Sequence, residues 1–237
     1  SMTFYQTLVT YYDEIFPLNV VTQQFLCSIF PKNSCLLDMG AGTGTMSLAL
    51  QKSGRKMTAF EPDSSMVEKI KQKNTAETEH ILVYQKGMLE LDEISESFDG
   101  IYCIGNTLAH LQNEQEIFRF FQQVYQHLHP TGILILQTVN FDQINKLKTF
   151  EFPVIRKENC IFMRKYEQNG TYIRFVITLK TQNEIRSNTT ILFPASSQTI
   201  LQLLQEAGFS HLQTYGNFKK EAFEKTSSAF IVIGQKV

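Results

Sequence analysis

The chain lacks the features that mark several large classes of protein. No apolar run approaches the ~18 residues that a membrane-spanning helix needs, and the aromatic and polar segment 4–12 does not resemble a signal peptide. No stretch is rich in lysine or arginine, and the net charge of −1 disfavours a nucleic-acid partner. We therefore predict a cytoplasmic protein with no membrane partner.

Cysteine is scarce, and its spacing gives no sign of a metal site. The 4 cysteines are Cys27, Cys35, Cys103 and Cys160. None of them stands in C-x-x-C spacing, so we expect buried thiols in a reducing compartment and no bound metal. His127 and His129 lie near the expected end of a helix, where cations are favoured without any metal.

The composition is that of a globular protein with a core. A length of 237 residues with 43% hydrophobic residues suits a single α/β domain over residues 1–237, with or without an insertion. Apolar periodicity predicts strands at 35–38, 57–61, 81–84, 98–104, 133–139, 209–215 and 229–233. Helices are expected at 18–29, 45–53, 64–70 and 199–207, and from a capping-box-like pair of Asn113 and Glu116 to residue 128.

One stretch organises the rest of the chain. Residues 36–50 predict a buried strand, a turn built from Gly40, Gly42 and Gly44, and the start of a helix. Such a turn offers unpaired N–H groups and lets a ligand approach the main chain. The spacing does not fit a dinucleotide fingerprint, whose third small residue would be Thr45 or Ser47, and no lysine follows the last glycine as a P-loop requires.

A second feature supports a nucleotide-like ligand. Glu61 stands at the carboxyl end of the next expected strand. An acidic residue at that place can accept hydrogen bonds from both ribose hydroxyls. The alternatives are a solvated carboxylate at Glu61 and a glycine turn that binds nothing.

The run Asp38-x-Gly40-x-Gly42-x-Gly44 resembles motif I of the class I S-adenosylmethionine (SAM)-dependent methyltransferases. The resemblance covers most of the chain. It implies a Rossmann-like, seven-stranded and mostly parallel sheet with helices on both faces and an antiparallel last strand. In that family the loop holds the amino acid end and the ribose of SAM, and S-adenosylhomocysteine is the product.

The resemblance also implies a set of cofactor-binding residues. Tyr12 lies in a Tyr-Asp segment that in relatives covers the SAM pocket, although it could instead pack on the core. Met66 could lie beside the adenine or in the core. Met88 replaces the Asp that many relatives carry after this Gly, which leaves the backbone of Gly87 and Met88 for the adenine. The expected site consists of Tyr12, Asp38, Gly40, Ala41, Gly42, Gly44, Glu61, Pro62, Met66, Gly87, Met88 and Ile104.

The segment after the fourth expected strand should face the transferred methyl group, because ligands lie outside the carboxyl ends of the strands. Its polar groups are Asn106 and His110, which we predict to be catalytic; a His110 bonded to the backbone is the alternative. Gly105–Leu111 and the later Asn140-Phe141-Asp142 resemble the glycine and sarcosine N-methyltransferase branch. Phe141 replaces the Tyr of that branch, and its hydroxyl is lost.

Residues 150–195 read as an antiparallel β insertion. Strands are expected at 159–167, 172–180 and 185–193, with a hairpin at Asn169-Gly170. The insertion should form a lid or an oligomer contact, such as that of a homodimer. An arginine that binds an acceptor carboxylate could come from any of four positions in it: Arg156, Arg164, Arg174 and Arg186.

The predicted function is transfer of the SAM methyl group to a small-molecule acceptor, with an amine favoured, by in-line displacement. SAM carries an activated methyl group, so alignment of the acceptor can supply much of the catalysis without a metal or a nucleophile. Two alternatives are open at this point: methylation of RNA or protein, and a SAM-binding scaffold without catalysis.

Overall fold

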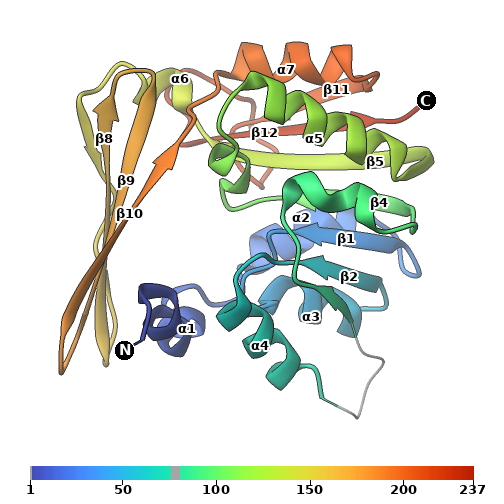
Figure 1. The fold of residues 1–237 in the computed structure, drawn as a ribbon. Helices are drawn as coiled ribbons and strands as arrows, with labels where there is room; N and C mark the ends of the chain where they lie inside the picture. Colours follow the sequence, from blue (N-terminus) through green and yellow to red (C-terminus); the bar gives the residue numbers. More distant parts are fainter. Residues whose placement is uncertain (1, 76–80) are drawn as a thin grey trace.

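The computed structural model describes residues 2–75 and 81–237, which form two β-sheets and their covering helices (Figure 1). The larger sheet contains β1 (Cys35–Met39), β2 (Lys56–Phe60), β3 (Leu82–Tyr84), β4 (Phe98–Cys103), β5 (Leu128–Val139), β11 (Ser210–Tyr215) and β12 (Ala229–Gln235). The smaller sheet contains β6 (Thr149–Glu151), β7 (Ile155–Arg156), β8 (Cys160–Asn169), β9 (Tyr172–Thr181) and β10 (Ile185–Leu192). The helices are α1 (Phe4–Ile15), α2 (Val20–Ile29), α3 (Thr45–Lys52), α4 (Ser64–Lys73), α5 (Glu114–Gln126), α6 (Phe141–Ile144) and α7 (Ser197–Glu206), with 3-10 helices η1 (Met88–Glu93) and η2 (Thr107–His110).

The larger sheet has the strand order β11-β12-β5-β4-β1-β2-β3. The pairs among β5, β4, β1, β2 and β3 are parallel. β12 is antiparallel to both of its neighbours, β5 and β11. This confirms the predicted Rossmann-like sheet with seven strands and an antiparallel last strand.

Helices cover both faces of this sheet. On one face, α5 and α7 bury Phe120, Phe121 and Leu204 against the strands. On the other face, α2 and α3 bury Leu26 and Leu50. A parallel sheet is apolar on both sides, so each face needs such a layer. No helix in residues 2–75 and 81–237 has both the length and the apolar character needed to cross a bilayer.

Two local expectations need correction. β5 begins at Leu128 rather than at 133, because Leu128 already pairs with Phe98 on the far side of a register shift. The capping pair at Asn113 is also only half formed. Asn113 accepts the backbone N–H of Glu116 at 2.9 Å, but the Glu116 carboxylate accepts from the backbone of Gln112 instead of from Asn113.

The smaller sheet has the order β10-β9-β8-β6, with β7 paired to β8. All its neighbouring strands are antiparallel. The expected hairpin joins β8 to β9, and Gly170 takes the positive φ of 64° that the turn requires. The short helix α6 was missed, because its four residues are too few to show a helical period.

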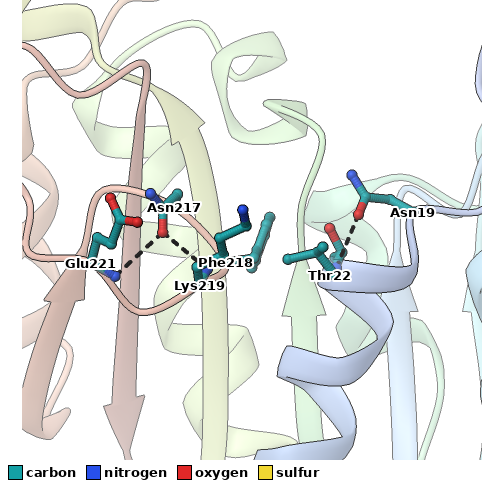
Figure 2. Close-up of a pocket in the computed structure, with 7 residues that line it drawn as sticks. Asn19, Thr22, Asn217, Phe218, Lys219 and Glu221 are labelled. Carbon is teal, nitrogen blue, oxygen red and sulfur yellow. Dashed lines mark hydrogen bonds between the residues drawn. The ribbon is translucent and has the colours of Figure 1, made fainter.

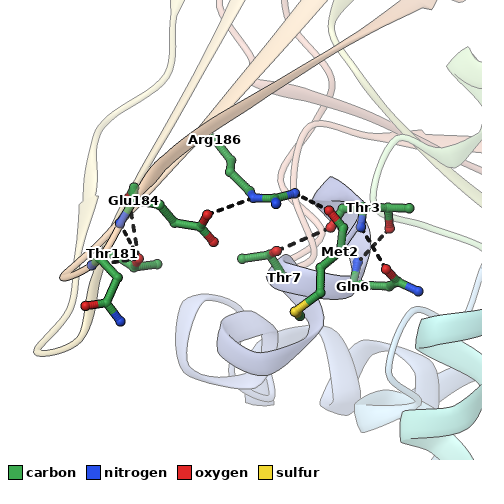
Figure 3. A network of polar contacts seen from close by, with 8 residues as sticks. Met2, Thr3, Gln6, Thr7, Thr181, Glu184 and Arg186 are labelled. Atoms are coloured by element: carbon green, nitrogen blue, oxygen red, sulfur yellow. Dashed lines mark hydrogen bonds and ion pairs between the residues drawn. The ribbon is translucent and has the colours of Figure 1, made fainter.

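Helix α1 connects the two sheets. Its apolar side packs Phe4 and Leu8 against Phe162 and Leu179 of the smaller sheet. Arg186 on β10 pairs with Glu184 at 3.1 Å and donates a hydrogen bond to the carbonyl of Met2, just before the helix (Figure 3). In Figure 1 the tips of β1 and β2 point toward the smaller sheet, with α1 between them and its lower end. The carboxyl ends of the parallel strands therefore face a wall made by α1 and the smaller sheet.

Candidate active site

The glycine turn connects β1 to α3, and its backbone is approached closely from two sides. Gly40 and Gly42 have φ values of 83° and 60°, which disfavour any side chain. A Cβ on Gly40 would lie 2.7 Å from Cγ2 of Thr107, and one on Gly42 would lie 3.0 Å from the hydroxyl of Tyr12. η2 and α1 thus meet the turn where only glycine fits.

Glu61 follows β2 directly and reaches back to the turn. Its Oε1 accepts the N–H of Gly42 at 2.8 Å, and its Oε2 accepts the N–H of Asp63 at 2.8 Å. The side chain is buried, and burial raises the pKa of its carboxyl to about 7. Each oxygen keeps a second lone pair, so the carboxylate can still accept two further hydrogen bonds. The structure brings together the two features that the sequence singled out independently.

Asp38 lies beneath the turn rather than on its open side. It is 3% exposed and accepts the hydroxyl of Ser47, in the first turns of α3, at 2.7 Å. Burial raises the pKa of Asp38 to about 6. Its observed contact fixes the start of α3 against β1. Direct binding of the cofactor by Asp38 remains a prediction.

Tyr12 lies over the turn, with its hydroxyl at Gly42, and its ring also packs against the core; its contact with SAM stays a prediction. Burial, and then the charge of Glu61, raise the pKa of the Tyr12 hydroxyl to about 12, so it stays protonated and can donate. Next to it, Asp13 accepts the hydroxyl of Thr43 and pairs with Nζ of Lys73 at 2.9 Å. Asp13 is the Asp of the Tyr-Asp segment, whereas the sequence analysis did not point to Lys73. These contacts tie α1 to the turn and to α4.

The predicted adenine contacts are arranged differently. Met66 is buried with Phe4 of α1, which is the core alternative. The N–H of Gly87 already donates to the Glu90 carboxylate at 2.8 Å, and Met88 packs against the core. Of the remaining cofactor residues, Ala41 and Ile104 are half-buried beside the core under α2 and α3, Pro62 is exposed, and Gly44 begins α3. Contact of these residues with adenine stays a prediction.

Asn106 is engaged on both sides of its amide. It has a φ of 63°, its Nδ2 donates to the Tyr166 hydroxyl at 3.0 Å, and its Oδ1 accepts the N–H of Val139 at 2.9 Å. The residue therefore ties the end of β4 to β5 and to β8. These bonds fit a positioning role better than the catalytic role that the sequence suggested.

His110 ends η2 with an exposed side chain. Partial burial lowers the pKa of its imidazole, so the neutral form dominates at neutral pH. Within the described part of the chain, its ring nitrogens make no hydrogen bond, so the alternative of a backbone-bonded ring is not observed. A catalytic role for His110 stays a prediction.

Tyr166 is a residue of this region that the sequence analysis missed. It is buried on β8, and Phe141 stacks on it at 6.1 Å between ring centroids. Phe141 stands at the position where the resembling branch carries a Tyr. The sequence carries no clear signal for its position, because apolar residues stand on both faces of this segment: Cys160 and Phe162 on one, Ile161 and Met163 on the other.

A separate cavity of about 350 Å³ lies between the start of α2 and the loop after β11 (Figure 2). Asn217 accepts the backbone N–H groups of Lys219 and Glu221, and Asn19 accepts that of Thr22. These side chains are therefore used to hold the local backbone. None of the predicted site residues lines this cavity.

No cluster of three or more His, Cys, Asp or Glu side chains in residues 2–75 and 81–237 is arranged to hold a metal ion. The polar groups around the turn are instead carboxylates, hydroxyls and backbone N–H groups, which suit an organic ligand with hydroxyl and amine groups.

Comparisons with known proteins agree with this geometry. Residues 36–132 match the model of a methyltransferase domain. The chain is 26% identical over 204 residues to a glycine/sarcosine N-methyltransferase from Aphanothece halophytica, covering 85% of this chain and 76% of that protein. The fold is similar to that of a SAM-dependent methyltransferase from Clostridium acetobutylicum (TM-score 0.84, 14% identity, 99% of both chains). It is also similar to a SAM-bound amino pentose methyltransferase from Micromonospora echinaspora (TM-score 0.71, 15% identity, 100% of this chain and 99% of that one).

Proposed function

We propose that the chain is a class I SAM-dependent methyltransferase and that it methylates the amine of a small molecule. The observation that carries the proposal is the buried carboxylate of Glu61 beside the glycine turn, in a chain whose curated relative is a glycine/sarcosine N-methyltransferase. The amino pentose methyltransferase, which shares the fold, likewise acts on a small molecule.

The residues present fit the cofactor. Glu61 has two free lone pairs for the ribose hydroxyls. Gly42 has no side chain at a point where a Cβ would lie 3.0 Å from the Tyr12 hydroxyl, so the backbone of the turn can be approached closely there. Binding of the ribose by Glu61 and of the amino acid end by the turn is part of the proposal.

SAM supplies a methyl group that is already activated by its positive sulfonium. The remaining task of the protein is to align an unprotonated amine in line with that methyl group. Asn106 and Tyr166, bonded to each other at 3.0 Å, give the acceptor side a fixed polar point. The His110 imidazole, neutral at physiological pH, can accept a proton from an ammonium group before transfer.

A small acceptor fits the surroundings better than RNA or a folded protein. α1 covers the glycine turn and is held there by the Asp13–Lys73 pair. The smaller sheet stands opposite the ends of β1 and β2 (Figure 1). The net charge of −1 also disfavours a nucleic-acid partner.

The test begins with calorimetric titration of SAM and S-adenosylhomocysteine, with NAD as the control ligand. We expect micromolar binding of both adenosyl ligands and none of NAD. Glu61→Ala should weaken binding, and the exposed Glu68→Ala on α4 should not. The second step measures S-adenosylhomocysteine release with amines, RNA and proteins as acceptors. Tight SAM binding without turnover on any amine would refute the proposal and favour the scaffold.

A further inference from the structure

The glycine turn of residues 40–44 has one polar side chain, that of Thr43. Thr43 is 1% exposed, and its hydroxyl donates a hydrogen bond to the Asp13 carboxylate in the last turn of α1. The other residues of the glycine turn are glycine and alanine, so they can form hydrogen bonds only through their backbone. Thr43 is therefore the point at which another element can hold the turn by a side chain.

Asp13 is itself held by Lys73, in the last turn of α4. Nζ of Lys73 lies 2.9 Å from Oδ2 of Asp13 and donates to the hydroxyl of Thr45, the first residue of α3, at 3.1 Å. Partial burial raises the pKa of Asp13, but the hydrogen bonds from Thr43 and Lys73 hold this pKa below its ordinary value. Asp13 is therefore ionised at neutral pH. The four side chains form a polar cluster, the Asp13 cluster, that joins α1, the turn, α3 and α4.

The Asp13 cluster adjoins Tyr12, the residue before Asp13. The Tyr12 hydroxyl would lie 3.0 Å from a Cβ on Gly42, whose N–H donates to Glu61 at 2.8 Å. The position of α1 therefore decides what lies beside the N–H group and the carboxylate that are proposed to bind SAM. A shift of the last turn of α1 would move Asp13 and Tyr12 together.

The two ends of α1 are held by different parts of the molecule. The apolar side of the helix packs on the smaller sheet, with Met66 of α4 as a further neighbour. The carbonyl of Met2, just before the helix, accepts a hydrogen bond from Arg186 of β10 (Figure 3). Figure 1 shows α4 beside α1. The start of α1 is thus fastened to the smaller sheet, and the Asp13 cluster fastens its end to the glycine turn.

We infer that Asp13 and Lys73 are positioning residues for the methyl donor: their ion pair holds the end of α1 on the glycine turn and so places Tyr12 beside the bound SAM. The inference rests on the proposed function, in which the turn binds SAM. Asp13 is engaged by Thr43 and Lys73, so the pair acts through Tyr12 and the turn. The apparent affinity for SAM then falls with the fraction of chains in which α1 is in place.

The experiment measures the Kd of S-adenosylhomocysteine by calorimetry, which needs no acceptor. Lys73→Met keeps an unbranched side chain but removes its charge, and we expect it to weaken binding about fivefold, the upper range for a partly exposed ion pair. Lys73→Arg keeps the charge and should stay within about twofold of wild type. Lys71→Met is the matched control, because Lys71 is an exposed residue of the same last turn of α4. It should change the Kd by less than about twofold.

Asp13→Asn removes the same ion pair from its other side. It keeps an oxygen that can accept the Thr43 hydroxyl but loses the charge that faces Lys73. Because both substitutions break one pair, the double variant Asp13→Asn with Lys73→Met should bind S-adenosylhomocysteine no more weakly than the weaker of the two single variants. Asp13→Asn also keeps the inference testable if Lys73→Met does not fold.

Two further measurements separate a positioning role from a general loss of stability. Asp99→Asn removes a carboxylate that accepts the N–H of Cys35 at 2.8 Å, at the amino end of β1, whereas the glycine turn follows the carboxyl end of that strand. It should lower the unfolding free energy without changing the Kd. Hydrogen exchange reports on α1 itself: S-adenosylhomocysteine should protect the amides of residues 4–15 in wild type and protect them less in Lys73→Met.

The outcomes separate this inference from the proposed function. An unchanged Kd in Lys73→Met and Asp13→Asn, with a lowered unfolding free energy as in Asp99→Asn, would make the pair a purely structural one and overturn the inference. Additive losses in the double variant, an equal loss in Lys71→Met, or equal protection of α1 in wild type and Lys73→Met would overturn it too. All of these results leave the methyltransferase standing. Absence of S-adenosylhomocysteine binding to wild type would refute the proposed function, and the inference with it.

Discussion

Raising the pH from about 6 to about 8 is expected to tighten SAM binding about tenfold, because Glu61 titrates in this range. Burial, and to a lesser degree the charges of Asp63 and Asp38, raise the pKa of Glu61 to about 7, against the opposing hydrogen bonds from the N–H groups of Asp63 and Gly42. The ionised carboxylate can accept both ribose hydroxyls, whereas the protonated form has lost part of that capacity. Binding therefore favours the form that exists at higher pH.

The magnitude follows from the fraction ionised. With a pKa of about 7, about one-tenth of Glu61 is ionised at about pH 6 and about nine-tenths at about pH 8. Affinity should rise in proportion, by roughly one order of magnitude. Glu61→Gln removes the titration, so its affinity should be weaker than that of wild type at about pH 8 and should lack this tenfold rise.

The stability of the ligand-free chain should change in the opposite direction. The folded-state pKa of Glu61 is raised from 4.5 to about 7, so the folded state binds more protons than the unfolded state between these values. As the pH rises through this window, the unfolding free energy of the wild-type chain should fall by up to about 3 kcal/mol more than that of Glu61→Gln. Asp38, whose raised pKa has the same sign, is present in both proteins and cancels in the comparison.

The assay is calorimetric titration of SAM at several pH values, with urea unfolding of the ligand-free chain at the same values. Comparison of the two proteins removes the titration of SAM itself. A pH profile of affinity that is identical in wild type and Glu61→Gln would refute the reasoning, since Glu61 would then not be the group that binds the ribose.

Four further substitutions test the neighbouring contacts. Gly42→Ala should destabilise the chain by about 1–2 kcal/mol because of its positive φ, and it should weaken SAM binding because the new methyl group meets the Tyr12 hydroxyl 3.0 Å away. Adding Tyr12→Phe removes that oxygen and should restore part of the SAM affinity; additive losses of affinity in the double variant would contradict the contact. Ser47→Ala should lower the unfolding free energy by about 1–3 kcal/mol at neutral pH because buried Asp38 loses its hydroxyl partner, with the loss shrinking in acid; a loss independent of pH would argue against an ionised partner. Asn106→Gly keeps the backbone conformation but removes both amide bonds, so kcat should fall by more than SAM affinity; the reverse would place Asn106 in the cofactor site.

The glycine turn and Glu61 could be predicted from the sequence because each depends on a short local pattern. A strand followed by alternating glycines is compatible with few backbone conformations. In a parallel sheet of this kind, the carboxyl end of the next strand lies beside the carboxyl end of the first. The structure places Glu61 2.8 Å from the N–H of Gly42, as that logic requires. The hairpin at Asn169-Gly170 was predictable for the same reason.

The acceptor side depends on contacts between distant parts of the chain. Asn106 looked free in the sequence, but its amide is held by Tyr166 on a strand that packs only in the folded state. The pairing of Asp13 with Lys73 likewise joins two helices that no local pattern connects. The partial burial of Arg164, one of the four arginines of the insertion, could not be predicted, because alternation along a strand does not say which face meets the rest of the protein.

The division of the molecule into two sheets bears on how such a chain could be redesigned. The turn that is proposed to bind the cofactor comes from residues 36–61, whereas the opposite wall is one continuous stretch, residues 149–192. That stretch packs Phe162 and Leu179 against α1. Its hydrogen bonds to the rest of the chain include those from Arg186 to Met2, from Asn106 to Tyr166, and from the Tyr172 hydroxyl to the carbonyl of Gln112 at 3.0 Å. A graft of residues 149–192 from another protein of this fold should preserve these contacts. It would then replace the wall that is proposed to face the acceptor and leave the residues that are proposed to bind SAM unchanged.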